Sequence, residues 1–564
     1  MVRARPVLAA GLGLALVAAV LLAFRGVVAN GFVNWDDELY VANPQLRSLG
    51  QDSLLWMLTA RYPQWQPLTW LSHALDNVLW GASPASHHAT SLALHALVVL
   101  LLALLFSALL GAALPETAKL QPGLALASAA VAAALFGLHP LRVESVAWIS
   151  ARKDLLCALF FIAATLAWLR YLWAESPRAR RIAYLSAALL FAAALASKPT
   201  AVSFAAVLLI LDAHPALGRS PAPWPGRVLT EKLPFFAAAL ALSLATASPE
   251  PGRPLESWKD PRTGEAAPGW PAPTRLERWA RIGLAVASYP VKTLWPAHLV
   301  PYYPEAEPDP AVELGIGAAC LALLASCGLA WRRGLVSWPL AWLAYGAMIA
   351  PVSGIVLLAG PSVADRFSYL PTTSLLALVA GGLVWLGARA ERRRALLPAF
   401  AACVLGLVVL GILTARQVAV WRDSESLWTA VIDAYPDRVA QAYANLGGFH
   451  HQQAAARQDR ALLGRAEQEY RKAVDVLARQ REAFFPIVHN NLGRLYQDEG
   501  DPARAEQYFQ LALKIAPNYL RARVNLARLL FLEGRLDEAI RECRKVQRWN
   551  DLTCEPAALE RASR

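Results

Sequence analysis

Residues 89–112 read ATSLALHALVVLLLALLFSALLGA, a run of 24 residues without Asp, Glu, Lys or Arg. About 20 apolar residues are needed for a helix to cross the hydrocarbon core of a bilayer. This stretch therefore predicts a membrane-spanning helix. The whole chain follows the same trend, because 56% of its 564 residues are hydrophobic and only 17% are charged. Its mean hydropathy of +0.35 is too high for a soluble protein of this length and indicates many spans.

Similar apolar blocks on both sides of this run predict about 11 spans within a membrane domain of residues 1–416. The expected spans are 7–29, 89–112, 122–138, 155–173, 182–211 as a pair, 233–248, 312–330, 336–358, 372–388 and 396–415, with 280–296 as a helix lying at the outer face. Ser197-Lys198-Pro199 interrupts 182–211, which predicts a tight pair of helices that turns at this tripeptide. The alternative is one long helix at 182–211, with 280–296 as a full span instead of a helix lying at the membrane face. The first block resembles a signal peptide, but its length favours an uncleaved span.

Basic residues set the expected orientation. The net charge is +12, and the clusters that follow apolar blocks are Arg178, Arg180 and Arg181, then Arg332 and Arg333, then Arg389 and Arg392 to Arg394. Such clusters are typical of cytoplasmic loops. Counting spans from an inside N-terminus then places 31–88, 139–154, 364–366 and the C-terminal region outside. No basic stretch interleaved with aromatic residues favours nucleic-acid binding, so we expect no nucleic-acid partner.

The C-terminal region contains internal repeats. Asn491-Leu492-Gly493 recurs as Asn525-Leu526-Ala527 after 34 residues, and Gly500 recurs as Gly534. This period is that of the tetratricopeptide repeat, a pair of antiparallel helices. Asn445-Leu446-Gly447 begins an earlier copy with an insertion. We predict about three repeats over residues 440–552, forming an extracytoplasmic α-solenoid that binds a protein or peptide.

Acidic residues in the first outer loop, residues 31–88, are the candidate catalytic groups. Asn34-Trp35-Asp36-Asp37-Glu38 follows the first span directly, and Trp35 is suited to the interface. Asp36 or Asp37 can act as a general base at the membrane face. The alternative is a solvated cluster of loop acids.

Histidine and basic side chains at the same membrane face are candidates for binding a phosphate or a sugar. They are His87, His88, His139, Arg152, Lys153, Lys198, Asp365 and Arg366. Cations outside depart from the usual charge bias and suit a lipid phosphate, although pairing with Glu144 and Asp154 is an equal alternative. The histidine pair lacks the spacing of a metal cage, so no cofactor is assigned, and a divalent metal stays an alternative.

The chain resembles the transmembrane and tetratricopeptide repeat family of O-mannosyltransferases and its bacterial relatives. The matching stretches are Asn34-Trp35-Asp36-Asp37, Pro67-Leu68-Thr69-Trp70, His87-His88, His139-Pro140-Leu141-Arg142-Val143-Glu144-Ser145-Val146-Ala147-Trp148, Arg152-Lys153-Asp154, Ser197-Lys198-Pro199 and Ala364-Asp365-Arg366-Phe367-Ser368-Tyr369-Leu370-Pro371.

The resemblance implies an all-α, polytopic bundle of the GT-C type followed by the repeats. It implies an inverting transfer of a sugar, mannose by default, from a polyprenyl-phosphate donor to a Ser/Thr hydroxyl or another extracytoplasmic acceptor. Asp36 would be the base, with Asp37 as its partner or alternative. Arg152, Lys153 and Arg366 would contact the lipid phosphate.

Two other functions remain open at this stage. A transporter or flippase of a lipid-linked sugar would favour ionisable residues deep in the membrane, whereas these gather at one edge. A non-enzymatic scaffold anchored in the bilayer would need only one span. The Ala- and Arg-rich composition favours a bacterial inner membrane. Cys543 and Cys554 are expected either to form a disulfide outside the cytoplasm or to be free thiols.

Overall fold

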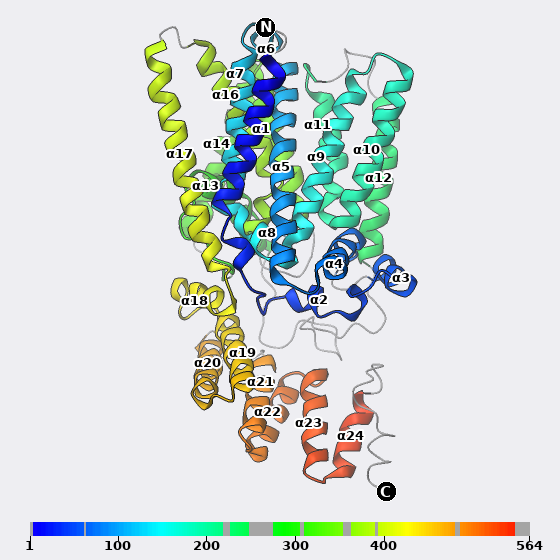
Figure 1. The fold of residues 1–564 in the computed structure, drawn as a ribbon, viewed down its shortest axis with the longest axis vertical. Coiled ribbons are helices and arrows are strands. Elements are labelled where there is room, and N and C mark those ends of the chain that lie inside the picture. The colour runs from blue at the N-terminus through cyan, green and yellow to red at the C-terminus, as the bar shows by residue number, and fades with distance from the viewer. Residues whose placement is uncertain are drawn as a thin grey trace. The chain divides into compact units, whose positions relative to one another are not determined.

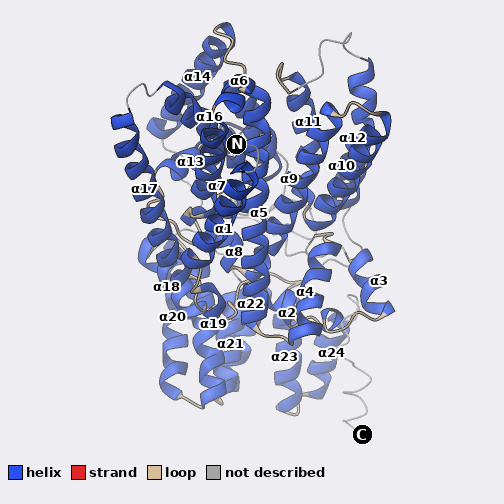
Figure 2. Cartoon of the chain, turned by 45° about the horizontal axis from the view of Figure 1, so that its top comes forward, coloured by secondary structure: helices blue, strands red, loops and turns tan. Residues whose placement is uncertain are grey.

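The computed structural model describes residues 4–60, 64–217, 226–247, 275–304, 310–353, 363–389, 393–479 and 486–546. Every regular element in these ranges is a helix and none is a strand (Figure 2), so the all-α prediction is confirmed. The chain divides into two compact units. The first comprises Met1–Ser248 and Leu276–Asp423, and the second comprises Pro249–Arg275 and Ser424–Arg564.

The first unit is a bundle of long apolar helices with shorter helices at its ends (Figure 1). Its α-helices are α1 (Ala4–Ala23), α2 (Asp37–Val41), α3 (Gln51–Thr59), α4 (Pro67–Trp80), α5 (Pro84–Ala113), α6 (Pro115–Leu120), α7 (Pro122–Gly137), α8 (Val143–Ala147), α9 (Arg152–Trp173), α10 (Pro177–Ser197), α11 (Phe204–Ala213), α12 (Gly226–Ala247), α13 (Arg275–Leu294), α14 (Pro310–Arg332), α15 (Ser337–Ile349), α16 (Thr372–Arg389) and α17 (Arg393–Val420). Short 3-10 helices join them: η1 (Val27–Ala29), η2 (Pro44–Leu46), η3 (Pro140–Arg142), η4 (Ile149–Ala151), η5 (Pro199–Ser203), η6 (Ala350–Val352) and η7 (Asp365–Ser368).

Seven helices within the described ranges are long and apolar enough to cross a membrane. They are Pro6–Ala29, Pro84–Ala113, Ile149–Trp173, Pro177–Ser197, Leu314–Arg332, Thr372–Arg389 and Ala401–Val420. An eighth is possible if Pro122–Gly137 and Pro140–Ala147, bent by 58°, form one broken span. Of the other expected spans, α11 and α15 are shorter, with 10 and 13 residues. The segment around 280–296 lies in α13, which does not meet the criteria for a span.

The predicted break at Ser197-Lys198-Pro199 is present. α10 begins at Pro177, where the side chain of Ser176 accepts a hydrogen bond from the Ala179 amide and caps the helix. It ends at Ser197, because Lys198 adopts the extended backbone conformation that the following proline favours. Lys198 pairs with Asp154 near the start of α9, with 2.5 Å between Nζ and Oδ1. The turn between α9 and α10, which precedes Arg178, therefore lies at the opposite end of this helical hairpin.

Glycines allow close contact between helices of the bundle. A Cβ atom on Gly137 of α7 would lie 2.7 Å from a methyl group of Val99 on α5. A Cβ atom on Gly387 of α16 would lie 2.6 Å from Leu124 of α7. Small residues at such positions let helix backbones approach in a lipid environment, where van der Waals packing drives association.

Several loop segments that are distant in sequence meet at one end of the bundle. In Figure 1 the helices α2, α3, α4 and α8 lie at the lower end, opposite α6 and the N-terminus. Contacts join them directly: the Thr69 hydroxyl donates to the carbonyl of Ser197 at 2.9 Å, and the Trp148 indole donates to the carbonyl of Trp35 at 2.8 Å. The structure thus brings together the segments that the span count placed on one face.

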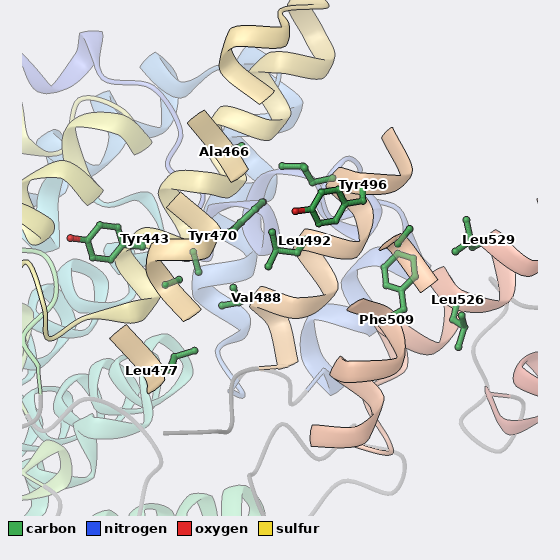
Figure 3. Packing of buried hydrophobic residues seen from close by; sticks show 14 of the residues in the cluster. Tyr443, Ala466, Tyr470, Leu477, Val488, Leu492, Tyr496, Phe509, Leu526 and Leu529 are labelled. Atoms are coloured by element: carbon green, nitrogen blue, oxygen red, sulfur yellow. The ribbon is translucent and has the colours of Figure 1, made fainter. Parts of the chain in front are cut away.

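The second unit contains the predicted helical repeats. After α18 (Ser424–Ala434), three helix pairs follow: α19 (Ala440–Arg457) with α20 (Arg460–Arg479), α21 (Pro486–Asp498) with α22 (Pro502–Ile515), and α23 (Leu520–Leu532) with α24 (Leu536–Val546). Their inner faces form one apolar core that includes Tyr470, Leu492, Phe509 and Leu526 (Figure 3).

Glycines have two roles in the repeats, one in the turns and one in helix packing. Gly500 and Gly534 have φ of 80° and 77° at the turns within the second and third pairs. A Cβ atom on Gly493 would lie 2.6 Å from the ring of Phe509, so this position requires a residue without a side chain. Cys543 is disulfide-bonded. Cys554, the other cysteine of the predicted pair, lies outside the described residues.

Candidate active site

The segment between α1 and α2 holds Asp36 in an unusual backbone conformation. Asp36 has φ of 62° and ψ of −12°, in the left-handed region, and its side chain is exposed. A residue with a side chain in this region costs about 1 kcal/mol or more, and it persists only where the surroundings hold it. Such positions cluster at active sites.

The neighbouring Asp37 is one of the groups that hold this segment. Its side chain is 2% exposed, and its carboxylate accepts hydrogen bonds from the amides of Val33 at 2.9 Å and Ser150 at 3.3 Å. The second bond joins the segment to η4, just before α9. Asp37 is therefore a buried anchor, whereas Asp36 faces solvent.

Burial also changes the acidity of Asp37. Loss of hydration raises the pKa of Asp37 to about 7, and the negative charge of Asp36 adds to this, whereas the hydrogen bonds from Val33 and Ser150 oppose it. The folded chain therefore binds this proton more tightly than the unfolded chain, whose carboxyl has a pKa near 3.8.

The resulting pH dependence can be measured. Between pH 3.8 and about 7 the Asp37 carboxyl is protonated in the folded state and ionised in the unfolded state. The stabilisation that this proton gives to the folded state is therefore lost as the pH rises through about 7. Asp37→Asn cannot titrate. We expect the Tm difference between the variant and the wild type to shift in favour of the variant as pH rises from about 5 to about 8. Glu38→Gln, at an exposed neighbouring position, should keep the wild-type dependence of Tm on pH. If the Tm of Asp37→Asn also followed the wild-type curve over this range, the raised pKa of Asp37 would be contradicted.

Aromatic packing fixes the residue before Asp36. The ring of Trp35 stacks on Trp148 with 4.4 Å between centroids and 22° between planes. The Trp148 indole also donates to the Trp35 carbonyl at 2.8 Å. Trp148 is 2% exposed and follows α8 directly, so the bundle buries the ring on which Trp35 stacks.

Arg366 contacts the Trp148 ring of this aromatic pair. Its guanidinium is 5.0 Å from the centre of the Trp148 ring and forms an ion pair with Glu144. The Arg366 amide also donates to the Glu144 carboxylate at 2.8 Å. The preceding residue, Asp365, accepts from Lys292 at 3.0 Å and from the Tyr303 hydroxyl at 2.9 Å. Arg366 thus has a fixed position close to the Trp35–Trp148 pair.

The two lysines among the predicted residues differ in their partners. Lys198 is buried and paired with Asp154. Lys153 is half-buried, and its Nζ is 3.3 Å from the Tyr40 hydroxyl. Within the described part of the chain, Lys153 forms no ion pair with a carboxylate. Lys153 thus differs from Arg152, Lys198 and Arg366, each of which pairs with a carboxylate.

Arg152 and His87 form a separate buried network. The guanidinium of Arg152 is fully buried and lies 2.6 Å from the carboxylate of Asp76 on α4. It also donates to the carbonyl of His87 at 2.7 Å and to the hydroxyl of Ser72 at 3.1 Å. These partners occupy Arg152, which joins α4, α5 and α9.

The remaining histidines bond to backbone groups. His88 Nε2 lies 3.4 Å from the carbonyl of Gly31, at the start of residues 31–37, which we call the Asp36 segment. His139 Nδ1 accepts from the Leu141 amide at 3.2 Å, and its Nε2 lies 3.0 Å from the carbonyl of Thr293 on α13. Among the described residues, no group of three or more His, Cys, Asp or Glu side chains has the arrangement of a metal site.

Sequence reasoning did not identify the contacts of Asp76, Lys292 or Tyr303. Lys292 lies in the segment whose placement the sequence left ambiguous, and Asp76 has no motif around it. Each interacts with its partner only through the tertiary fold, so no local pattern could have identified them.

Comparison with known proteins agrees with this organisation. Residues 496–559 match the Tetratricopeptide repeat family.

The chain is 33% identical over 153 residues to Protein O-mannosyl-transferase TMTC4 of Mus musculus, covering 25% of this chain and 20% of that protein. It is 31% identical over 141 residues to the Homo sapiens protein of the same name, covering 23% of this chain and 19% of that protein. A longer match, 24% identical over 562 residues, is to Protein O-mannosyl-transferase Tmtc3 of Drosophila melanogaster and covers 85% of this chain and 56% of that protein. The chain thus spans about a fifth of the first two relatives and about half of the third.

Proposed function

We propose that this chain, which belongs to the transmembrane and tetratricopeptide repeat family, is a membrane glycosyltransferase that moves a sugar from a polyprenyl-phosphate donor to a protein hydroxyl. The observation that carries the proposal is the exposed Asp36, held in a left-handed conformation beside the Trp35–Trp148 pair that Arg366 covers. Mannose is the proposed sugar because the relatives are named as mannosyltransferases.

In the proposed reaction Asp36 acts as the general base. Its carboxylate takes the proton of a Ser or Thr hydroxyl, whose oxygen forms a bond to the anomeric carbon. The bond between that carbon and the phosphate oxygen breaks, and polyprenyl phosphate leaves. A single displacement of this kind inverts the anomeric configuration.

The leaving phosphate needs neutralisation of its charge. We assign this to Lys153, which has no carboxylate partner within the described part of the chain, and to Arg366. The fully buried Arg152, which sequence analysis included in this set, is better suited to a structural role. His87, His88, His139, Lys198 and Asp365 are proposed to shape the site through the contacts described above.

The site is proposed to face the extracytoplasmic side of a bacterial inner membrane. The Arg178–Arg181 cluster lies at the far end of the α9–α10 hairpin, as the charge bias of cytoplasmic loops requires. The disulfide at Cys543 suits a repeat domain outside the reducing cytoplasm.

The direct test supplies membranes that contain the chain with radiolabelled polyprenyl-phosphate mannose. Transfer of label to protein supports the enzyme. Movement of the labelled lipid across the bilayer without transfer would instead favour a flippase. Neither activity, in membranes with normal levels of the chain, would favour a scaffold.

The repeats are proposed to bind the acceptor, and a point variant can test this. Gly493→Leu would force a side chain into the ring of Phe509, and overpacking of this kind costs about 1–3 kcal/mol. We expect transfer to protein acceptors to fall several-fold while binding of the labelled donor is unchanged. Gly464→Leu is the matched control, because a Cβ atom at this position of α20 would meet nothing within 4 Å apart from its chain neighbours and its own helix backbone. Equal transfer by both variants, with Gly493→Leu shown to loosen the repeats in proteolysis, would contradict a role in acceptor binding.

A further inference from the structure

The C-terminal end of α17 is attached to the Asp36 segment. The Gly31 amide donates to the carbonyl of Arg422 at 2.8 Å, and the Asn30 side chain donates to the carbonyl of Val418 at 3.2 Å. Nearly 390 residues separate the partners in the sequence. The last helix of the first unit therefore holds the backbone just before the proposed catalytic acid.

A tryptophan from the same helix end completes the aromatic stack. Trp421 is 1% exposed, and its ring lies parallel to Trp35, with 6.1 Å between centroids and 8° between planes. It also stacks on Trp148 at 5.9 Å. Three indoles thus pack together, and Trp35 has a partner from α8 and one from α17.

The geometry points to Trp421 as a positioning residue for Asp36, an inference that rests on the proposed function. Trp35 directly precedes Asp36, and the peptide group between them takes part in the φ rotation of Asp36. A change in the orientation of this peptide group therefore changes the left-handed backbone conformation of Asp36. Without the Trp421 indole, Trp35 loses one of its stacking partners and the segment can relax to a commoner conformation. The carboxylate would then be displaced from the hydroxyl whose proton it takes.

Trp421 also lies near the point in the sequence where the first unit ends and the second begins. Trp421 lies three residues before Ser424, where the second unit begins. The chain that leads to the repeats therefore starts from the residues that hold the Asp36 segment.

Three variants test the role: Trp421→Leu, Trp421→Phe and, as a control, Trp331→Leu, at a 57% exposed position of α14. A displacement of about 1 Å can lower a rate by about 10²-fold. We expect Trp421→Leu to lower kcat by about that factor and to change the donor KM much less, since Arg366, proposed to hold the phosphate, keeps its ion pair with Glu144. Trp421→Phe, which keeps an aromatic face, should recover most of kcat. Trp331→Leu should match the wild type.

A second measurement on the same variants does not depend on activity. Hydrogen–deuterium exchange of the peptide that contains residues 31–37 should become faster in Trp421→Leu and stay near the wild-type rate in Trp421→Phe and Trp331→Leu. Unchanged exchange in Trp421→Leu would overturn the inference, as would unchanged kcat in an active preparation. Absence of transfer by the wild type itself would instead count against the proposed function, and the exchange rates would still decide the role of Trp421.

Discussion

Asp36→Asn is expected to lower sugar transfer by about 10²–10⁴-fold, the usual contribution of a general base. Asn has the shape of Asp and tolerates the left-handed backbone, so the loss should come from the missing proton acceptor and not from a change in fold. The measurement is transfer of radiolabelled mannose from its polyprenyl phosphate to protein, in membranes with equal amounts of each form. The donor KM should change little, because Lys153 and Arg366, and not Asp36, are proposed to hold the phosphate.

Glu38→Gln provides the matched control for Asp36→Asn. Glu38 is also an exposed acid of the same segment, and no catalytic role is assigned to it. Its replacement should leave transfer near the wild-type level. If Asp36→Asn keeps full transfer while Asp37→Asn loses it, the base is Asp37, whose pKa of about 7 would also suit proton transfer near neutral pH.

Arg152→Met is expected to destabilise the chain by about 3–5 kcal/mol, the usual cost of removing one partner of a buried ion pair. The Asp76 carboxylate, 6% exposed, would keep its hydrogen bond from Thr90 but lose the guanidinium. The measurement is the thermal unfolding midpoint of the detergent-solubilised chain. Adding Asp76→Asn should restore part of the loss, because the uncompensated charge is then gone.

Lys153→Met is the control that separates a structural role from donor binding. Lys153 is adjacent in sequence and has no ion pair within the described ranges, so its loss should change stability little. It should, however, weaken binding of the labelled donor. A stable Arg152→Met chain that binds the donor poorly would show that Arg152, as the sequence suggested, contacts the lipid phosphate.

The sequence was sufficient for features that local patterns specify. Residues 89–112 predict a span because length and polarity alone decide whether a helix crosses a bilayer. The 34-residue period predicts the repeats, because Gly500 and Gly534 recur at turns with positive φ, and the position of Gly493 takes a small residue, Ala527, in the next copy. The break after Ser197 follows from the proline at 199.

The environments of the charged residues required the tertiary structure. Asp36 and Asp37 are adjacent and chemically identical, yet one is exposed and the other is buried between the amides of Val33 and Ser150. Arg152 and Lys153 are likewise adjacent, yet only Arg152 meets Asp76, 76 positions earlier in the chain. Burial and partnership depend on which segments the fold brings together, and neighbouring residues on a helix or turn point in different directions.

The sequence by itself therefore determined the class of this protein: an all-helical membrane bundle, a helical repeat domain, and a set of acids and cations at one membrane face. Only the tertiary structure decided which acid faces solvent, that Lys153 has no carboxylate partner among the described residues, and that Trp421 packs on Trp35, just before Asp36. The physical reason is the range of the interactions. Hydropathy and repeat period act over one helix or one repeat, whereas ion pairing and aromatic stacking join residues that are tens to hundreds of positions apart.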